Sequence, residues 1–297
     1  LLAIATTLDL ATARARYSLW LGANPPRFID FGSETDTQDQ SKIENRKSKI
    51  ENSITLRQLR HPLLVWQHQH EQGAAVIPVD LLIQPQIRVV TITGPNTGGK
   101  TVTLKTLGLA ALMAKVGLFV PAREPVELPW FEQILADIGD EQSLEQSLST
   151  FSGHIRRISR ILNAVAPQGN QLEVGEEIDS PTTHYPPSTQ SLVLLDEVGA
   201  GTDPAEGSAL AIALLQYLAD RALLTIATTH FGELKALKYE DERFENASVE
   251  FDDVSLAPTY RLLWGIPSRS NALTIARRLG LDPEVVEKAQ TYVGGAS

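Results

Sequence analysis

The sequence predicts an α/β fold in which helices flank a mainly parallel β-sheet. Short runs rich in β-branched residues alternate with helical patterns, as is typical of strands joined by crossover helices. Several of these runs are apolar throughout, which indicates strands covered on both faces. The composition is that of a globular domain, since 42% of the 297 residues are hydrophobic and 21% are charged.

The first 53 residues precede the predicted α/β domain. A helical pattern runs from Leu8 to Leu19 with no capping residue ahead of it, so we expect residues 1–22 to be the end of a longer helix. Residues 23–53 are polar and contain S-K-I-E-N-R-K followed by S-K-I-E-N-S, which we interpret as a linker with a short repeat. A charged helix is the alternative, although two copies are fewer than a coiled coil requires.

The α/β domain is expected over residues 54–293. Its strands are predicted, in order, at Arg88–Thr93, Phe131–Ile138, Leu192–Asp196 and Leu223–Thr229. Its helices are predicted at residues 100–116, 150–165, 204–221, 271–279 and 283–293. Asp203 and Pro204 suit the N-cap and first turn of the third helix. A low-complexity insertion is expected at 168–190, where four acids and three prolines occur without Lys or Arg.

Charge and cysteine content exclude several classes of function. The 26 basic and 36 acidic residues leave a net charge of −10, which disfavours tight, nonspecific binding of nucleic acid by this stretch alone. The sequence has no cysteine, which excludes disulfide scaffolds, thiolate metal sites and cysteine nucleophiles and favours a cytoplasmic location. Neither a membrane-spanning apolar run nor a secretory leader is recognisable, so we expect no membrane partner.

A glycine-rich turn follows the first predicted strand of the domain. Its residues fit G-x-x-x-x-G-K-[ST] between a strand and a helix, the context of a phosphate-binding loop; an ordinary glycine-rich turn is the alternative. Backbone N–H groups and the helix N-terminus would bind an anion, Lys100 would reach the β- and γ-phosphates, and the Thr101 hydroxyl would hold Mg²⁺. The predicted nucleotide contacts are Gly94, Pro95, Asn96, Thr97, Gly98, Gly99, Lys100, Thr101 and Val102.

An acidic pair ends the apolar strand predicted at 192–196. The carboxyl edge of a parallel sheet is where ligands bind in open α/β folds. Asp196 would therefore complete the Mg²⁺ site, and Glu197 would orient or deprotonate the attacking water. A solvated acidic pair would be the better interpretation if the glycine-rich turn were absent.

Two further segments are candidates for the same site. His230 follows the last predicted strand, where it would contact the γ-phosphate or the attacking water, although a lone His is more often structural. Ser149 and Thr150 lie at the start of the helix predicted at 150–165, where they would contact phosphate, cap the helix, or do both. On the same helix, a solvated basic face is expected at Arg156, Arg157 and Arg160.

Taken in order, these motifs resemble the ATPase domain of the MutS family, a relative of the ABC ATPases. The resemblance rests on G-P-N-T-G-G-K-T, S-L-S-T-F-S-G-H, L-V-L-L-D-E-V-G-A-G-T-D-P-A-E-G and A-T-T-H-F. Later segments, F-E-N-A-S-V-E-F-D, P-T-Y-R-L and R-S-N-A-L-T-I-A-R-R-L-G-L, look like the bacterial branch called MutS homologue two. The resemblance covers about residues 53–292 apart from the 168–190 insertion, and L-D-L-A-T-A-R-A-R-Y looks like the end of that family's lever helices.

The resemblance implies a P-loop NTPase fold of the ABC/MutS type and a dimeric, Mg²⁺-dependent ATPase. Each ATP would lie between the glycine-rich loop of one subunit and the Ser149 region of the other. In this family ATP hydrolysis drives lever and clamp movements on branched DNA or on stalled or collided ribosomes. Full-length members usually carry a C-terminal nuclease domain, and because nothing before Ser297 resembles it, we assign no nuclease activity to this chain.

Two competing functions share the nucleotide site. One is a non-hydrolysing switch in which ATP only holds an assembly together, against which the position of Glu197 beside Asp196 argues. The other is the nucleotide-binding subunit of a membrane transporter, against which the absence of the L-S-G-G-Q signature argues.

Overall fold

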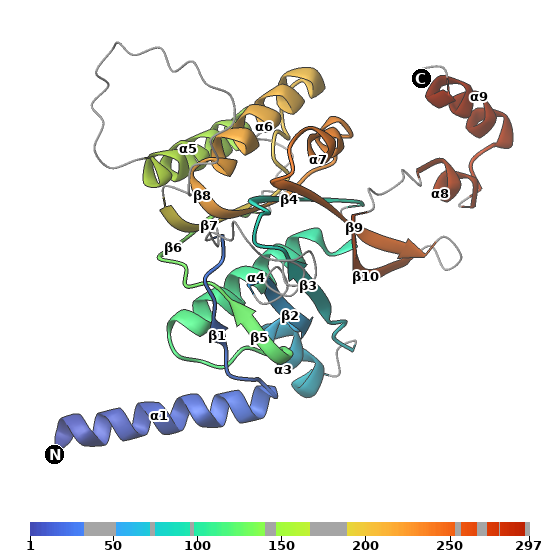
Figure 1. Ribbon diagram of the computed structural model, residues 1–297. Coiled ribbons are helices and arrows are strands. Elements are labelled where there is room, and N and C mark those ends of the chain that lie inside the picture. Colours follow the sequence, from blue (N-terminus) through green and yellow to red (C-terminus); the bar gives the residue numbers. More distant parts are fainter. Residues whose placement is uncertain are drawn as a thin grey trace, which may run out of the picture.

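The computed structural model describes residues 1–32, 52–71, 75–95, 98–139, 147–166, 189–252, 257–265, 272–278 and 280–294. Two β-sheets and the helices that cover them form the fold (Figure 1). The larger sheet has six strands in the order β10-β9-β4-β8-β7-β6, and the smaller has four in the order β1-β5-β2-β3. An α/β fold with a mainly parallel sheet is thereby confirmed.

The larger sheet contains the four strands predicted from apolar runs. They are β4 (Val89–Thr93), β6 (Gln133–Asp137), β7 (Thr189–Leu195) and β8 (Ala222–Thr228), joined by β9 (Phe244–Asp252) and β10 (Ala257–Trp264). Strand β4 pairs in parallel with β8 and β9, and β7 pairs in parallel with β6 and β8, whereas β10 is antiparallel to β9. The carboxyl ends of five strands therefore meet at one edge of the sheet.

Alternate residues of the strands face two separate layers of core. On one face, β4 and β7 pack against α4 (Lys100–Lys115) and the smaller sheet through Val90, Ile92, Leu192 and Leu194. On the opposite face, Val89, Val193 and Leu195 pack against α5 (Ser147–Val165), α6 (Pro204–Ala219) and α7 (Leu237–Glu240). The two-residue period of a strand thus explains why these runs are apolar throughout. Figure 1 shows α5, α6 and α7 on one side of the sheet and α4 on the other.

The smaller sheet was not predicted. It consists of β1 (Arg27–Phe28), β2 (Ile54–Leu59), β3 (Val79–Ile83) and β5 (Arg123–Leu128), with α3 (Pro62–His70) between β2 and β3. Charged residues interrupt β2 and β5, and β2 pairs with β5 across a long separation in the sequence. A strand with one exposed face and a distant partner lacks the continuous apolar run by which the central strands were recognised.

The segment that we interpret as a linker begins inside the fold. Strand β1 pairs in parallel with β5, and Asn24 forms an isolated bridge with Val120. Phe31 is buried in the same core as α4. Residues 24–31 thus belong to the smaller sheet and its core, while residues 41–51 of the repeat predicted at 41–53 lie outside the described residues.

The predicted insertion at 168–190 also needs a corrected boundary. Strand β7 begins at Thr189, whose N–H donates to the carbonyl oxygen of Arg221 at 3.0 Å. The last two residues of the predicted insertion therefore belong to the sheet. Residues 167–188 lie outside the described residues.

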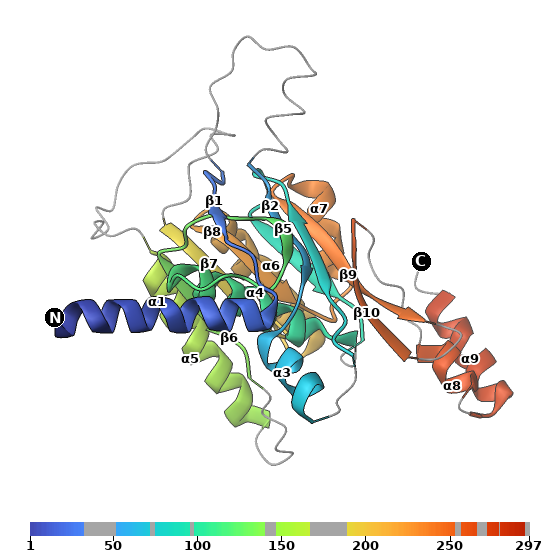
Figure 2. The same cartoon turned by 90° about the horizontal axis from the view of Figure 1, so that it is seen from below.

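Helices at both ends of the chain match the predicted positions. The first, α1 (Leu2–Leu21), exposes Leu8 and Leu19 and buries Leu21 against Val65 and Met113. Figure 2 shows its N-terminal part projecting beyond the rest of the molecule. At the other end lie α8 (Ala272–Arg278) and α9 (Pro283–Gly294). Among the described residues, no helix has both the length and the apolar character that crossing a membrane requires.

Candidate functional site

The glycine-rich turn joins the buried end of β4 to the start of α4. Gly94 and Gly99 have φ of 130° and 90°, in the left-handed region that favours glycine, and Gly99 is the N-cap of α4. The N–H of Gly98 donates to the carbonyl oxygen of Pro95 at 3.0 Å. Asn96 and Thr97 lie outside the described residues.

Strands β9 and β10 press against this turn. A Cβ atom on Gly94 or Gly98 would lie 2.4 or 2.5 Å from Cγ2 of Val249. A Cβ atom on Gly99 would lie 2.9 Å from Cδ1 of Tyr260. Glycine is therefore required here by close packing as well as by backbone conformation. Sequence reasoning missed both neighbours, because they come from strands that no local pattern assigned to this site.

Lys100 is the buried cation of the site. Only 2% of the residue is exposed, and its Nζ donates to the carbonyl oxygen of Gly94 at 2.5 Å. Burial lowers the pKa of Lys100, and the carboxylates of Glu197 and Asp196 partly offset this by raising it. The structure thus brings the turn and the acidic pair together. Thr101, the next residue of α4, is half-buried, and Val102 is exposed.

A buried threonine holds the acidic pair in place. The Thr228 hydroxyl, at the end of β8, donates to Oδ1 of Asp196 at 2.5 Å and accepts from the N–H of Glu197 at 2.8 Å. Asp196 is 6% exposed, and Glu197 has a φ of 47°. One hydroxyl therefore orients both acids. Thr228 precedes the predicted His230 by two residues in the sequence. Only its position at the end of β8, the parallel neighbour of β7, would have indicated this role.

For His230 and the start of α5, the described residues show no hydrogen bond to the acidic pair. His230 is exposed beyond β8, with its ring centroid 4.3 Å from that of Phe231. Ser149 and Thr150 lie in the first turn of α5, and their side chains lie outside what the structure describes. Phe151, the next residue, packs against the loop after Glu197, since a Cβ atom placed on Gly201 would lie 3.6 Å from the Cβ atom of Phe151. The roles predicted for His230, Ser149 and Thr150 stay predictions.

The loop after Glu197 leads into α6 through a close backbone contact. Asp203 caps α6, because its Oδ1 accepts from the N–H groups of Ala205 and Glu206 at 2.9 and 3.2 Å, and Pro204 occupies the first turn as predicted. Gly199 has a φ of 81°, and a Cβ there would lie 2.4 Å from the carbonyl oxygen of Gly207.

We expect Gly199→Ala to lower the free energy of unfolding by about 3 kcal/mol, because it combines a strained φ with a backbone clash. Gly139→Ala is the control, since a Cβ there meets nothing within 4 Å and its φ is not in the left-handed region. Urea unfolding of both variants is the measurement. Equal losses for the two would contradict the close packing of this loop.

A polar cluster beside the acids was not predicted. Asp137, at the end of β6, is 2% exposed and accepts hydrogen bonds from His154 and Arg157 of α5. Arg157 is therefore not part of the solvated basic face that we expected, although Arg156 and Arg160 are exposed. The signal available in the sequence was an acid at the end of a predicted strand, together with an i, i+3 pair on the next helix.

The residues fit a nucleotide phosphate chain with Mg²⁺. The glycines of the turn leave no room for a Cβ atom, so backbone groups line it, and a buried ammonium group lies beside it. Thr101 and Asp196 offer oxygen ligands, which Mg²⁺ prefers when phosphate and water supply the remainder. The donor set therefore suits the group that the motif implies.

Comparison with known proteins agrees with this geometry. The chain matches the family described as MutS domain V over residues 90–185 and 176–294. It is 67% identical over 297 residues to the Endonuclease MutS2 of Synechocystis sp., covering 100% of this chain and 34% of that protein. It is 52% identical over 240 residues to that of Shouchella clausii, covering 81% and 27% of the two chains.

A third relative, the Endonuclease MutS2 of Caldanaerobacter subterraneus, is 44% identical over 292 residues, covering 98% of this chain and 31% of its own length. The chain thus spans about a third of the length of these curated relatives. The family match begins at Val90 and covers well over half of the chain, including the glycine-rich turn and the acidic pair. The chain belongs to the MutS family and contains the ATPase domain of that family, MutS domain V.

Proposed function

We propose that this domain hydrolyses ATP to ADP and phosphate with Mg²⁺. The observation that carries the proposal is the buried Lys100 at the start of α4, close enough to Asp196 and Glu197 for both to affect its pKa. A phosphate-binding cation, a metal-binding acid and a second acid are the groups that phosphoryl transfer to water needs.

Each residue has a separate task in this proposal. Lys100 and backbone N–H groups of the glycine-rich loop bind the phosphates and stabilise the charge that develops on the leaving β-phosphate. Thr101 and Asp196 hold Mg²⁺, which neutralises phosphate charge when bound. Glu197 accepts a proton as water attacks the γ-phosphorus and the bond to the bridging oxygen breaks. His230 contacts the γ-phosphate.

We further propose that the active unit is a homodimer in which Ser149 and Thr150 contact the nucleotide held by the partner subunit. The support is chemical, because Ser149 and Thr150 lie in the first turn of α5, and the first turn of a helix has N–H groups without intrahelical partners and a partial positive charge. A second line of support is analogy, because the resemblance to MutS ATPases implies a nucleotide site shared between two subunits.

Turnover per subunit is therefore expected to rise with protein concentration and to level off once dimers form. Phosphate release measured over a dilution series, with sedimentation to report the oligomeric state, tests this. A rate per subunit that stays constant through the monomer range would contradict the shared site. Absence of phosphate release at every concentration would instead favour the non-hydrolysing switch.

For the full-length protein, we propose that ATP hydrolysis drives clamp and lever movement on branched DNA or on stalled or collided ribosomes in the cytoplasm. The high identity to proteins named Endonuclease MutS2 supports the assignment to this branch, and the lack of cysteine favours a reducing compartment. Binding of the full-length protein to a four-way DNA junction and to ribosomes, each measured with and without ATP, distinguishes the two partners.

A further inference from the structure

Asp137 joins helix α5 to the strand that carries the catalytic acids. Its Oδ2 lies 2.7 Å from Nδ1 of His154, and its Oδ1 accepts from Nε of Arg157 at 2.5 Å. Its backbone oxygen accepts the N–H of Asp196 at 2.9 Å. Asp137 therefore contacts α5 through its side chain and the acid-bearing strand through its main chain.

The environment makes this side-chain contact strong. The Asp137 side chain is 2% exposed, while His154 and Arg157 are 21% and 35% exposed and lie one turn apart on the same face of α5. A carboxylate this deeply buried depends on its partners, because removing one of them leaves an uncompensated buried charge. Bonds to a charged group are also stronger than bonds between neutral groups.

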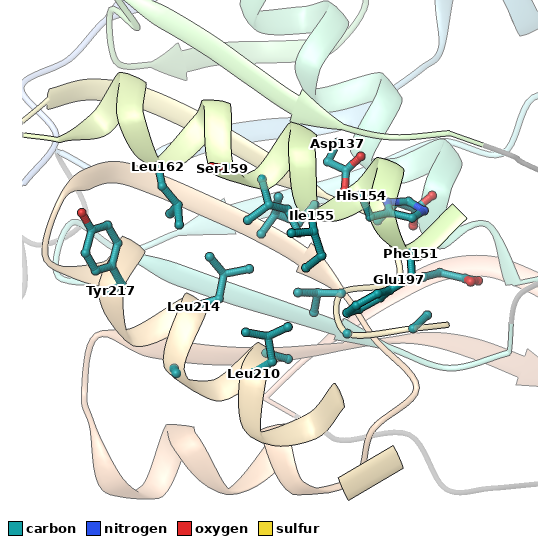
Figure 3. A pocket seen from close by; sticks show the side chains of 18 residues that line it. Asp137, Phe151, His154, Ile155, Ser159, Leu162, Glu197, Leu210, Leu214 and Tyr217 are labelled. Atoms are coloured by element: carbon teal, nitrogen blue, oxygen red, sulfur yellow. Dashed lines mark hydrogen bonds and ion pairs between the residues drawn. The ribbon is translucent and has the colours of Figure 1, made fainter. Parts of the chain in front are cut away.

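The face of α5 that looks towards α6 borders a cavity. A cavity of about 390 Å³ separates α5 from α6 and is lined on its two sides by Ile155, Ser159, Leu162, Leu210, Leu214 and Tyr217. Figure 3 shows Asp137 and His154 near the end of this cavity where Glu197 and Phe151 also lie. Ile158 and Leu162 of α5 pack against the core that α6 shares, and Asp137 adds the polar contact that ties the first half of the helix to the sheet.

We propose that Asp137 is a positioning residue. Its carboxylate holds α5 against the acid-bearing edge of the sheet and thereby sets where Ser149 and Thr150 meet the nucleotide of the partner subunit. The inference rests on the proposed dimeric function and assigns one more residue to it. The side chain of Asp137 acts in the site of the partner, whereas Glu197 acts in the site of its own subunit.

Asp137→Asn tests the proposal, because it removes the charge and keeps the shape and the main-chain bond to Asp196. We expect kcat to fall about tenfold to a hundredfold, as for a misplaced catalytic group, with the affinity for ATP unchanged. Arg157→Gln, at a more exposed position, is expected to shift kcat in the same direction. Arg156→Gln is the matched control, since Arg156 is exposed on the same helix and should leave the rate unchanged.

Mixing subunits separates positioning from general damage. In a dimer of Asp137→Asn with Glu197→Gln, one shared site contains both defects and the other contains neither. Two almost inactive proteins, mixed in equal amounts before ATP is added, should therefore recover about a quarter of the wild-type rate, because about half of the dimers are mixed. If Asp137→Asn does not fold by circular dichroism, Arg157→Gln takes its place.

Two outcomes would overturn the inference, and they are distinguishable. A mixture that stays inactive, while the wild-type rate still rises with concentration, means that Asp137 acts within its own subunit; the proposed function then stands. A wild-type rate per subunit that does not change on dilution contradicts the shared site, and the inference fails with it.

Discussion

Glu197→Gln is expected to lower ATP turnover by at least about a hundredfold, the contribution typical of a general base, while ATP binding is retained. The amide has the shape of the carboxylate but cannot accept the proton of the attacking water. The backbone should be undisturbed, because the N–H of Glu197, not its side chain, is the group bonded to Thr228. In the variant, Lys100 still has the negative charge of Asp196 nearby, so the phosphate-binding cation should keep its position.

Two measurements on the same preparation check this expectation. Phosphate release under single-turnover conditions reports the chemical step, and equilibrium titration with a fluorescent ATP analogue reports binding. Glu206→Gln is the matched control, because Glu206 is an exposed acid in the first turn of α6. Turnover that survives in Glu197→Gln would show that another group activates the water, and parallel loss of binding would show a structural role.

The central part of the fold was predictable because its signals are local. Strands β4 and β8 are buried along their whole length and β7 is buried from Ser191 onward, so apolar residues fill both of their faces. The strand-to-helix turn at 94–100 imposes glycine through both its backbone angles and its packing. Asp196 and Glu197 directly follow one of these strands, so the topology of a parallel sheet alone places them near the turn.

The remainder depends on partners that are distant in the sequence. Arg157 and its neighbour Arg156 have the same side chain, and only the position of Asp137 on another strand makes one of them an ion-pair partner. Val249 and Tyr260 lie against the glycine-rich turn because β9 pairs with β4 and β10 pairs with β9. No period or motif within the segments themselves carries this information.

Lys100→Met is expected to weaken the binding of ATP about tenfold to a hundredfold, the effect of losing one hydrogen bond between charged groups. The methionine side chain fills nearly the same volume, so the turn and α4 should keep their positions. Titration with a fluorescent ATP analogue is the measurement. Lys105→Met is the control, because Lys105 is exposed on the same helix.

The same substitution is expected to stabilise the nucleotide-free protein at neutral pH. Since burial lowers the pKa of Lys100, the folded state holds this proton less tightly than the unfolded chain. The wild-type protein should therefore gain stability as pH rises from the lowered pKa towards the ordinary value for lysine, and Lys100→Met should lack this gain. Thermal unfolding without nucleotide, followed from pH 7 up to the ordinary lysine pKa of 10.5, measures the difference. A variant less stable than the wild type at pH 7 would mean that attraction to Asp196 and Glu197 outweighs the cost of burial, whereas the expected result means that the site keeps a costly buried charge in readiness for phosphate.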